Sequence, residues 1–234
     1  MQGVPHKKSE GVSPHTIEVF RNAFINLFSE LGLLVNEEMF VEHMSETHTR
    51  WLKTVAHYCQ PYHPQTDLAT TYSSRESLYK RSVGKLGVPT HLVRDEDAYI
   101  EGVYRHGMVV QSDIPYRALC AHHLLPVLGR AHVAYIPKDK WTGLSKLSRV
   151  VYGIAHSEPS IQEVIGNKVA DALSTYLEAV GSACIITAEH SCMGCRGVEE
   201  PYVLTTTASL RGVFQTDSTC RQELYNIINN AEVR

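Results

Sequence analysis

The sequence contains no run of about 18 consecutive apolar residues, the length that a membrane-spanning helix requires. It has no excess of positive charge either: 22 Lys and Arg against 25 Asp and Glu give a net charge of -3. That balance argues against non-specific binding to nucleic acid. The first ten residues lack the apolar core of a signal peptide. We therefore expect a cytoplasmic protein that associates with neither membranes nor nucleic acids.

Cysteines are few, six in 234 residues, and they do not form the dense framework of a small secreted protein. Internal repeats and long low-complexity segments are also absent. With 43% hydrophobic residues, the chain can bury a sizeable core. These features indicate one or two globular domains in a reducing compartment.

Two short segments rich in cysteine and histidine stand out, residues 120–123 (CAHH) and 190–196 (HSCMGCR). Cys120 and His123 have the Cys-x-x-His spacing that lets one turn of chain bind a metal ion, and Cys192 could supply a third ligand. Sulfur and nitrogen ligands favour zinc. Three protein ligands leave the fourth position for water, whose pKa zinc lowers to about 7.

Two histidines beside these ligands, His122 and His190, are candidates for proton transfer. If residues 189–192 are extended, His190 and Cys192 point to the same face, because side chains alternate along a strand. One alternative is a closed structural site, in which Cys195 is the fourth ligand and no water binds. Another is a redox-active Cys-x-x-Cys pair, although no thioredoxin-like strand and helix surround it.

A cluster of cations lies within residues 143–149 (GLSKLSR). Ser145, Lys146 and Arg149 are near the start of a predicted helix, where backbone N–H groups and the helix dipole favour phosphate. Lys146 and Arg149 are three residues apart and are therefore neighbours on one helix face. Arg196 could bring a planar guanidinium group to the same phosphates. The alternative is an ordinary solvated basic helix face.

The pair Gln162 and Glu163 is a candidate for reading a nucleobase. The Glu163 carboxylate could accept hydrogen bonds from N1–H and the 2-amino group of guanine, two donors that adenine cannot offer together. The alternative is a glutamate at a helix N-terminus, where it interacts favourably with the dipole.

Periodicity predicts helices in the first part of the chain. Ser13 and Pro14 are typical of an N-cap and a first turn. The apolar residues that follow at helical spacing are Ile17, Phe20, Phe24, Leu27 and Leu31. A second helix is expected from Asn36 and a third from about Thr47, and residues 60–75 are expected to be a loop.

From residue 99 onward the pattern changes to short β-prone segments separated by helices. The expected elements are a strand or hairpin over 99–112, a strand over 130–136, helices over 144–155 and 159–180, strands over 183–188 and 202–210, and a last helix capped by Asp217. The two middle helices would cover one face of a four-stranded antiparallel sheet, which is an α+β arrangement.

Five motifs, in this order, resemble those of the GTP cyclohydrolase I family. They are residues 120–126 (CAHHLLP), 131–137 (AHVAYIP), 143–149 (GLSKLSR), 162–163 (QE) and 188–198 (AEHSCMGCRGV). A fainter match is residues 46–50 (ETHTR). Five ordered motifs are more specific than any single one.

The resemblance implies a tunnelling fold, in which the sheets of several subunits join into a barrel. The catalytic domain would span residues 96–234 and follow an N-terminal helical region, residues 1–95. The family is typically a homodecamer of two stacked pentamers with substrate sites between subunits. The open sheet edges of one protomer would otherwise be a liability, so the fold itself predicts an oligomer.

The implied activity is zinc-dependent hydrolysis of GTP at guanine C8, with release of formate and formation of 7,8-dihydroneopterin triphosphate. This is the first step of tetrahydrofolate, pterin or deazapurine biosynthesis. The residues implied are Cys120, His123 and Cys192 as zinc ligands, Lys146, Arg149 and Arg196 at the triphosphate, and Gln162 and Glu163 at the guanine.

Proton transfer is implied for two histidines. His190 would protonate the ring nitrogen beside C8, and His122, together with Ser145, would help to open the ribose. Two other functions stay open: a related tunnelling-fold enzyme that acts on another purine or pterin, and a non-catalytic assembly protein stabilised by zinc.

Overall fold

The computed structural model describes residues 12–31, 46–73, 107–138 and 140–232. The helix expected from Asn36, and the expected boundary between residues 95 and 96, lie outside these ranges. Within them, no helix combines the length and the apolar character that crossing a membrane requires.

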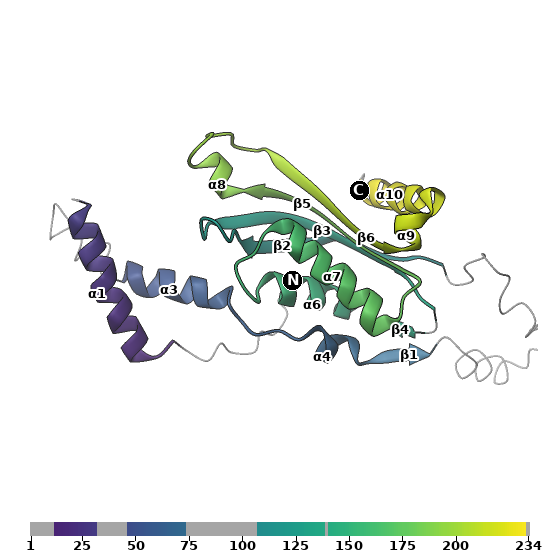
Figure 1. Cartoon of the computed structure of the whole chain (residues 1–234), viewed down its shortest axis with the longest axis horizontal. Coiled ribbons are helices and arrows are strands. Elements are labelled where there is room, and N and C mark those ends of the chain that lie inside the picture. Colours follow the sequence, from purple (N-terminus) through teal and green to yellow (C-terminus); the bar gives the residue numbers. More distant parts are fainter. Residues whose placement is uncertain (1–11, 32–45, 74–106, 139, 233–234) are drawn as a thin grey trace, which may run out of the picture.

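A four-stranded antiparallel sheet with the order β2-β3-β5-β6 forms the centre of the molecule (Figure 1). Its strands are β2 (Val109–Leu119), β3 (Pro126–Ile136), β5 (Gly181–His190) and β6 (Leu204–Gly212). The sheet and its order along the chain confirm the prediction and fit the tunnelling fold.

Two helices, α6 (Leu144–Ala155) and α7 (Gln162–Leu177), cover one face of this sheet (Figure 1). The helix residues buried against the sheet include Leu147, Val150, Val151, Ile165, Val169 and Leu173. Their spacing of three or four residues follows the helical repeat. The range predicted for α6 is confirmed at both ends.

The opposite face of the sheet carries a second, smaller core. Two helices pack there, α9 (Val213–Thr216) and α10 (Ser218–Glu232). Alternation along β3 divides its side chains between the two cores: Val133 lies under α6 and α7, and Ala134 lies in the core formed with α9 and α10.

The start of α7 differs from the prediction of a helix over 159–180. The Ser160 N–H donates to the Leu119 carbonyl (3.0 Å), and the Ala121 N–H donates to the Ser160 carbonyl (3.2 Å). Because these bonds hold Ser160 beside the end of β2, α7 begins only at Gln162. They also tie the segment that carries Cys120 to the start of α7.

The first sheet strand extends further than predicted. The expected strand over 99–112 was wrong at its C-terminal end, since β2 continues to Leu119; residues 99–106 lie outside the described residues. A register shift between Gln111 and Ile114, with Asp113 at φ 60°, interrupts the alternation. Such a bulge removes the period-two pattern by which a sequence reveals a strand.

The segment expected to be a loop, residues 60–75, contains regular structure. It forms a short helix, α4 (Pro64–Leu68), and a short strand, β1 (Thr71–Ser73), which pairs with β4 (Lys140–Thr142). Leu68 is only 1% exposed and belongs to the main core. Burial of this side chain explains why a polar, proline-containing segment is ordered here.

Two helices, α1 (Pro14–Glu30) and α3 (Thr47–His57), lie to one side of the sheet (Figure 1). The predicted cap is confirmed, because the Thr16 N–H donates to Ser13 Oγ (3.1 Å). Phe20 stacks on Trp51 with ring centroids 5.1 Å apart. No residue of α1 is buried in one chain.

The predicted cap of the last helix is present and gives a first testable expectation. Asp217 Oδ1 accepts hydrogen bonds from the N–H groups of Thr219 (2.8 Å) and Cys220 (3.2 Å). An Asp217→Ala variant leaves both donors without this acceptor and should lower the free energy of unfolding by about 0.5–2 kcal/mol. Urea denaturation measures the change, and Glu223→Ala on the exposed face of α10 is the control that should have little effect.

Candidate active site

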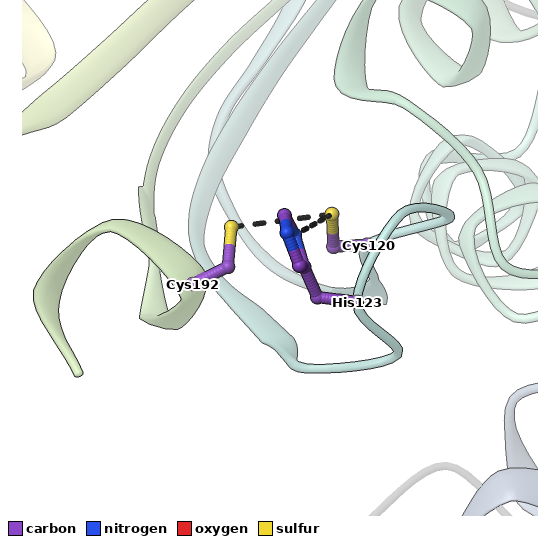
Figure 2. Close-up of side chains that lie close together, drawn as sticks. All are labelled: Cys120, His123 and Cys192. Atoms are coloured by element: carbon purple, nitrogen blue, oxygen red, sulfur yellow. Dashed lines mark hydrogen bonds between the residues drawn. The ribbon is translucent and has the colours of Figure 1, made fainter. Parts of the chain in front are cut away.

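Three potential metal ligands converge at one end of the sheet. Cys120 follows β2, His123 lies in the turn that leads to β3, and Cys192 lies in α8 (Ser191–Gly194) after β5. Pairing of Val127 with His190 brings the two segments together. Figure 2 shows the two sulfurs and the imidazole ring pointing toward one another.

The distances within this group suit a tetrahedral metal ion. The Cys120 sulfur is 3.8 Å from His123 Nδ1 and 4.0 Å from the Cys192 sulfur, and all three ligand atoms lie within 4.8 Å of one another. Zinc bonds of about 2.3 Å to sulfur and 2.0 Å to nitrogen at tetrahedral angles place ligand atoms about 3.5–3.8 Å apart. The donor set and its spacing therefore fit zinc with little adjustment.

The turn around Cys120 is stabilised by backbone hydrogen bonds. The Cys120 N–H donates to the Leu125 carbonyl (3.0 Å), and the Leu124 N–H donates to the Cys120 carbonyl (2.8 Å). Burial raises the pKa of the Cys192 thiol, and the neighbouring Cys120 sulfur raises it further. A cation between the sulfurs would reverse this effect, because it favours the thiolate that a metal requires.

Cys195 does not belong to the ligand group formed by the described residues. It is exposed, whereas Cys120 is buried and Cys192 is partly buried. The condition considered for residues 189–192, an extended chain, does not hold, because β5 ends at His190 and Ser191–Gly194 form α8. The helical turn places Cys192 at the group, which has three members among the described residues.

His190, Gln162 and Glu163 lie at the same end of the sheet. His190 Nε2 is 2.9 Å from Gln162 Oε1. Partial burial lowers the pKa of His190, and the nearby Glu163 carboxylate acts in the opposite direction. Glu163 is exposed at the start of α7, whereas Gln162 is 3% exposed and its amide is hydrogen-bonded to the protein.

Two further predicted residues lie beside the ligand group. His122 Nδ1 is 4.0 Å from the Cys120 sulfur. An Arg196 guanidinium nitrogen is 2.5 Å from His123 Nε2. Both side chains are exposed, so they border the group on its solvent side.

The remaining predicted residues, Ser145, Lys146 and Arg149, lie at a different end of the sheet. Ser148, in the same helical turn, accepts a hydrogen bond from Gln111 Nε2 (2.7 Å), and Gln111 pairs with Val133. Val133 is six residues beyond Val127, which is about 20 Å along a strand. One chain therefore does not bring these cations to its own ligand group.

The two cations share an acidic partner that the sequence did not reveal. Asp67 Oδ1 is 3.4 Å from Lys146 Nζ and 3.6 Å from an Arg149 guanidinium nitrogen. The Tyr62 hydroxyl donates to Asp67 Oδ2 (3.1 Å). Lys146 and Arg149 lie about eighty positions after Asp67, so no local sequence pattern indicates their contact with it. The contact becomes visible only when α4 docks on α6. At the N-terminus of α6, no side chain caps the first turn.

The chain is similar to known proteins over most of its length. A family model described as GTP cyclohydrolase I matches residues 23–229. GTP cyclohydrolase 1 of Streptococcus pneumoniae strains R6 and D39 is 48% identical to the chain over 121 residues, and that of strain Hungary19A-6 is 47% identical over the same number. These matches cover 52% of this chain, and the chain spans 65% of the length of each relative. The chain belongs to the GTP cyclohydrolase I family.

Proposed function

We propose that this protein hydrolyses GTP at guanine C8, releases formate and forms 7,8-dihydroneopterin triphosphate. The observation that supports this most is the group of Cys120, His123 and Cys192, which has three ligands, fits zinc, and lies at the sheet end that carries His190. The similar proteins of Streptococcus pneumoniae are named GTP cyclohydrolase 1. The product class would place the enzyme at the start of pterin or tetrahydrofolate synthesis.

In the proposed mechanism a metal ion would activate water, and two histidines would transfer protons. Zinc bound by the three ligands would supply Lewis acidity and an activated water. His190 would deliver a proton to the ring nitrogen beside C8 from its charged form; partial burial lowers its pKa, so this form releases the proton more readily. His122, exposed beside Cys120, would assist the opening of the ribose.

Base recognition is assigned to Glu163. Its carboxylate is exposed at the first turn of α7, close enough to His190 to affect the pKa of that residue. A carboxylate there can accept from both N1–H and the 2-amino group of guanine. Adenine lacks this pair of donors, so GTP would be preferred over ATP.

Triphosphate binding is assigned to Lys146 and Arg149, with Ser145 and Arg196. In the free protein, Asp67 holds the two cationic tips close together. The uncapped first turn of α6 adds backbone N–H donors beside them. These groups could neutralise a polyphosphate when an anion replaces Asp67 as their partner.

Assembly of several copies would complete the site. The ligand group and the α6 cations lie at different ends of one chain's sheet, so a GTP molecule needs the cations of a second copy. The edge strands β2 and β6 have one neighbour each within the described sheet, and a homo-oligomer could pair them. We propose a homo-oligomer with substrate sites between subunits, a decamer as the family resemblance implies.

The central experiment is incubation of the zinc-loaded protein with GTP. We expect formate and an oxidisable product with pterin fluorescence, both abolished by a chelator and restored by zinc. ATP is the matched control and should yield neither. Pterin formation from another purine but not from GTP would instead identify a related enzyme, and zinc binding without any product would identify a non-catalytic assembly protein.

A mixing experiment tests the site between copies. His190→Ala removes a group at the metal end of the chain, and Arg149→Ala removes a cation at the other end. If sites form between subunits, mixed oligomers of the two impaired variants contain some sites with both residues intact, and at GTP concentrations below the raised KM they exceed the activity of either variant alone. Unmixed variants are the control, and mixtures that show no gain after proven subunit exchange would exclude this arrangement.

The Arg149→Ala variant alone gives a further expectation. Loss of one charge-assisted hydrogen bond costs about 1.5–3 kcal/mol, so KM for GTP should rise about 10- to 100-fold with unchanged zinc content. Steady-state kinetics and metal analysis measure both quantities. Lys168→Ala is the control, because Lys168, on α7, is an exposed cation paired with Glu158; an equal rise in KM in that variant would show a non-specific charge effect.

A further inference from the structure

The side-chain amide of Gln162 is buried between α7 and the sheet. Its Nε2 lies 3.0 Å from the carbonyl oxygens of Ile186 and Thr205, and 3.1 Å from Thr207 Oγ1. Its Oε1 lies 2.9 Å from His190 Nε2. The residue is 3% exposed, so the protein itself occupies the hydrogen-bonding groups that the family resemblance would direct to guanine.

These neighbours determine which way the amide points. Two of the three partners of Nε2 are carbonyl oxygens, which only accept hydrogen bonds. A flipped amide would place Oε1 against those carbonyls and leave buried acceptors facing one another without hydrogen bonds. The NH2 group therefore faces β5 and β6, and the oxygen faces His190.

The orientation of the amide determines the tautomer of His190. Gln162 Oε1 can only accept, so His190 Nε2 must carry a hydrogen to form the 2.9 Å contact. In the neutral ring Nδ1 is then the acceptor, and in the charged ring Nδ1 is the nitrogen whose proton can leave without breaking this bond. Proton exchange is thus restricted to one atom of the ring.

We propose that Gln162 is a positioning residue, which holds His190 in the Nε2–H tautomer and directs Nδ1 to the substrate. This inference rests on the proposed function for its catalytic consequence. A contact of Gln162 with guanine would need its amide to leave four partners in the protein, whereas the positioning role uses the contacts as they stand.

The tautomer can be measured in the full-length protein with 15N-labelled histidine by magic-angle-spinning NMR, with the His190 signals identified by their loss in His190→Asn. We expect hydrogen on Nε2 and none on Nδ1 in the neutral wild-type ring, and a mixture of tautomers in Gln162→Met. Hydrogen on Nδ1 in the wild type, or an unchanged tautomer in the variant, would overturn the inference. The wild-type measurement requires neither a folded variant nor GTP turnover, so it is independent of the proposed activity.

Kinetics separate positioning from substrate contact. Gln162→Met should lower kcat about tenfold, part of the 10²–10⁴-fold that a general acid contributes, with KM for GTP unchanged. A rise in KM at constant kcat would mean that Gln162 contacts the base and would overturn the inference. Gln222→Met is the control, because Gln222 is exposed on α10, where its amide donates to Asn226, and its replacement should leave both constants unchanged.

Discussion

A Cys192→Ala variant should lose its metal and with it almost all formate production. Cys192 is one of three ligands within 4.8 Å of one another, and two remaining ligands hold zinc far more weakly than three. Zinc lowers the pKa of a bound water to about 7, far below that of free water, so loss of the ion should reduce kcat at least about 10³-fold. Metal analysis of the purified variant and a formate assay measure both effects.

Cys195→Ala is the matched control for this prediction. It removes the same chemical group three residues later, from a side chain that is exposed and outside the ligand group of the described residues. Zinc content and formate production should therefore stay at wild-type levels. If Cys195→Ala also loses its zinc, the site is closed by a fourth sulfur and the proposed hydrolysis has no position for water.

A His190→Ala variant should retain zinc and lose most of its turnover. His190 is not a member of the ligand group, so one zinc per chain should stay bound. A general acid contributes about 10²–10⁴-fold, and kcat should fall by that factor while GTP still binds. Single-turnover measurements of formate release, together with metal analysis, distinguish the loss of a proton donor from the loss of the metal.

The control for His190 is an exposed histidine far from the sheet. His15→Ala, in the first turn of α1, should change neither zinc content nor kcat. Loss of zinc in His190→Ala would contradict the assigned role, because it would make His190 part of the metal site. Unchanged kcat would remove it from the chemistry altogether.

Local features of the fold could be predicted because their hydrogen bonds join residues close in sequence. The Ser13 and Asp217 caps each bond to N–H groups two or three residues later, and the range of α6 follows from its own apolar repeat. Strand boundaries were less accurate, since pairing partners decide where a strand ends. The bulge before Ile114 is one example, because it breaks the alternation that a single sequence displays.

The three candidate metal ligands were predicted in part from spacing and in part from the family resemblance, and the structure brings them together. Cys120 and His123 are three residues apart, so one turn brings them together whatever the rest of the chain does. Cys192 is different: its place at the group depends on β5 pairing with β3 and on the helical turn of α8. Cys192 could thus be recognised as a candidate ligand from the sequence, but its position beside Cys120 and His123 follows from the strand register.

Residue types and short-range spacings thus predicted the candidate donor set, the candidate cations and the α+β class. Three features could be recognised only in the folded chain. They are the bond between Gln162 and His190, the ion pairs of Asp67 with Lys146 and Arg149, and the separation of those cations from the candidate metal ligands. Each depends on how far apart two distant segments lie in space. Strand pairing and helix docking set such distances through burial and hydrogen bonding along the whole sheet. Burial and hydrogen bonding of this kind join residues far apart in the sequence, where no periodic pattern indicates the contact.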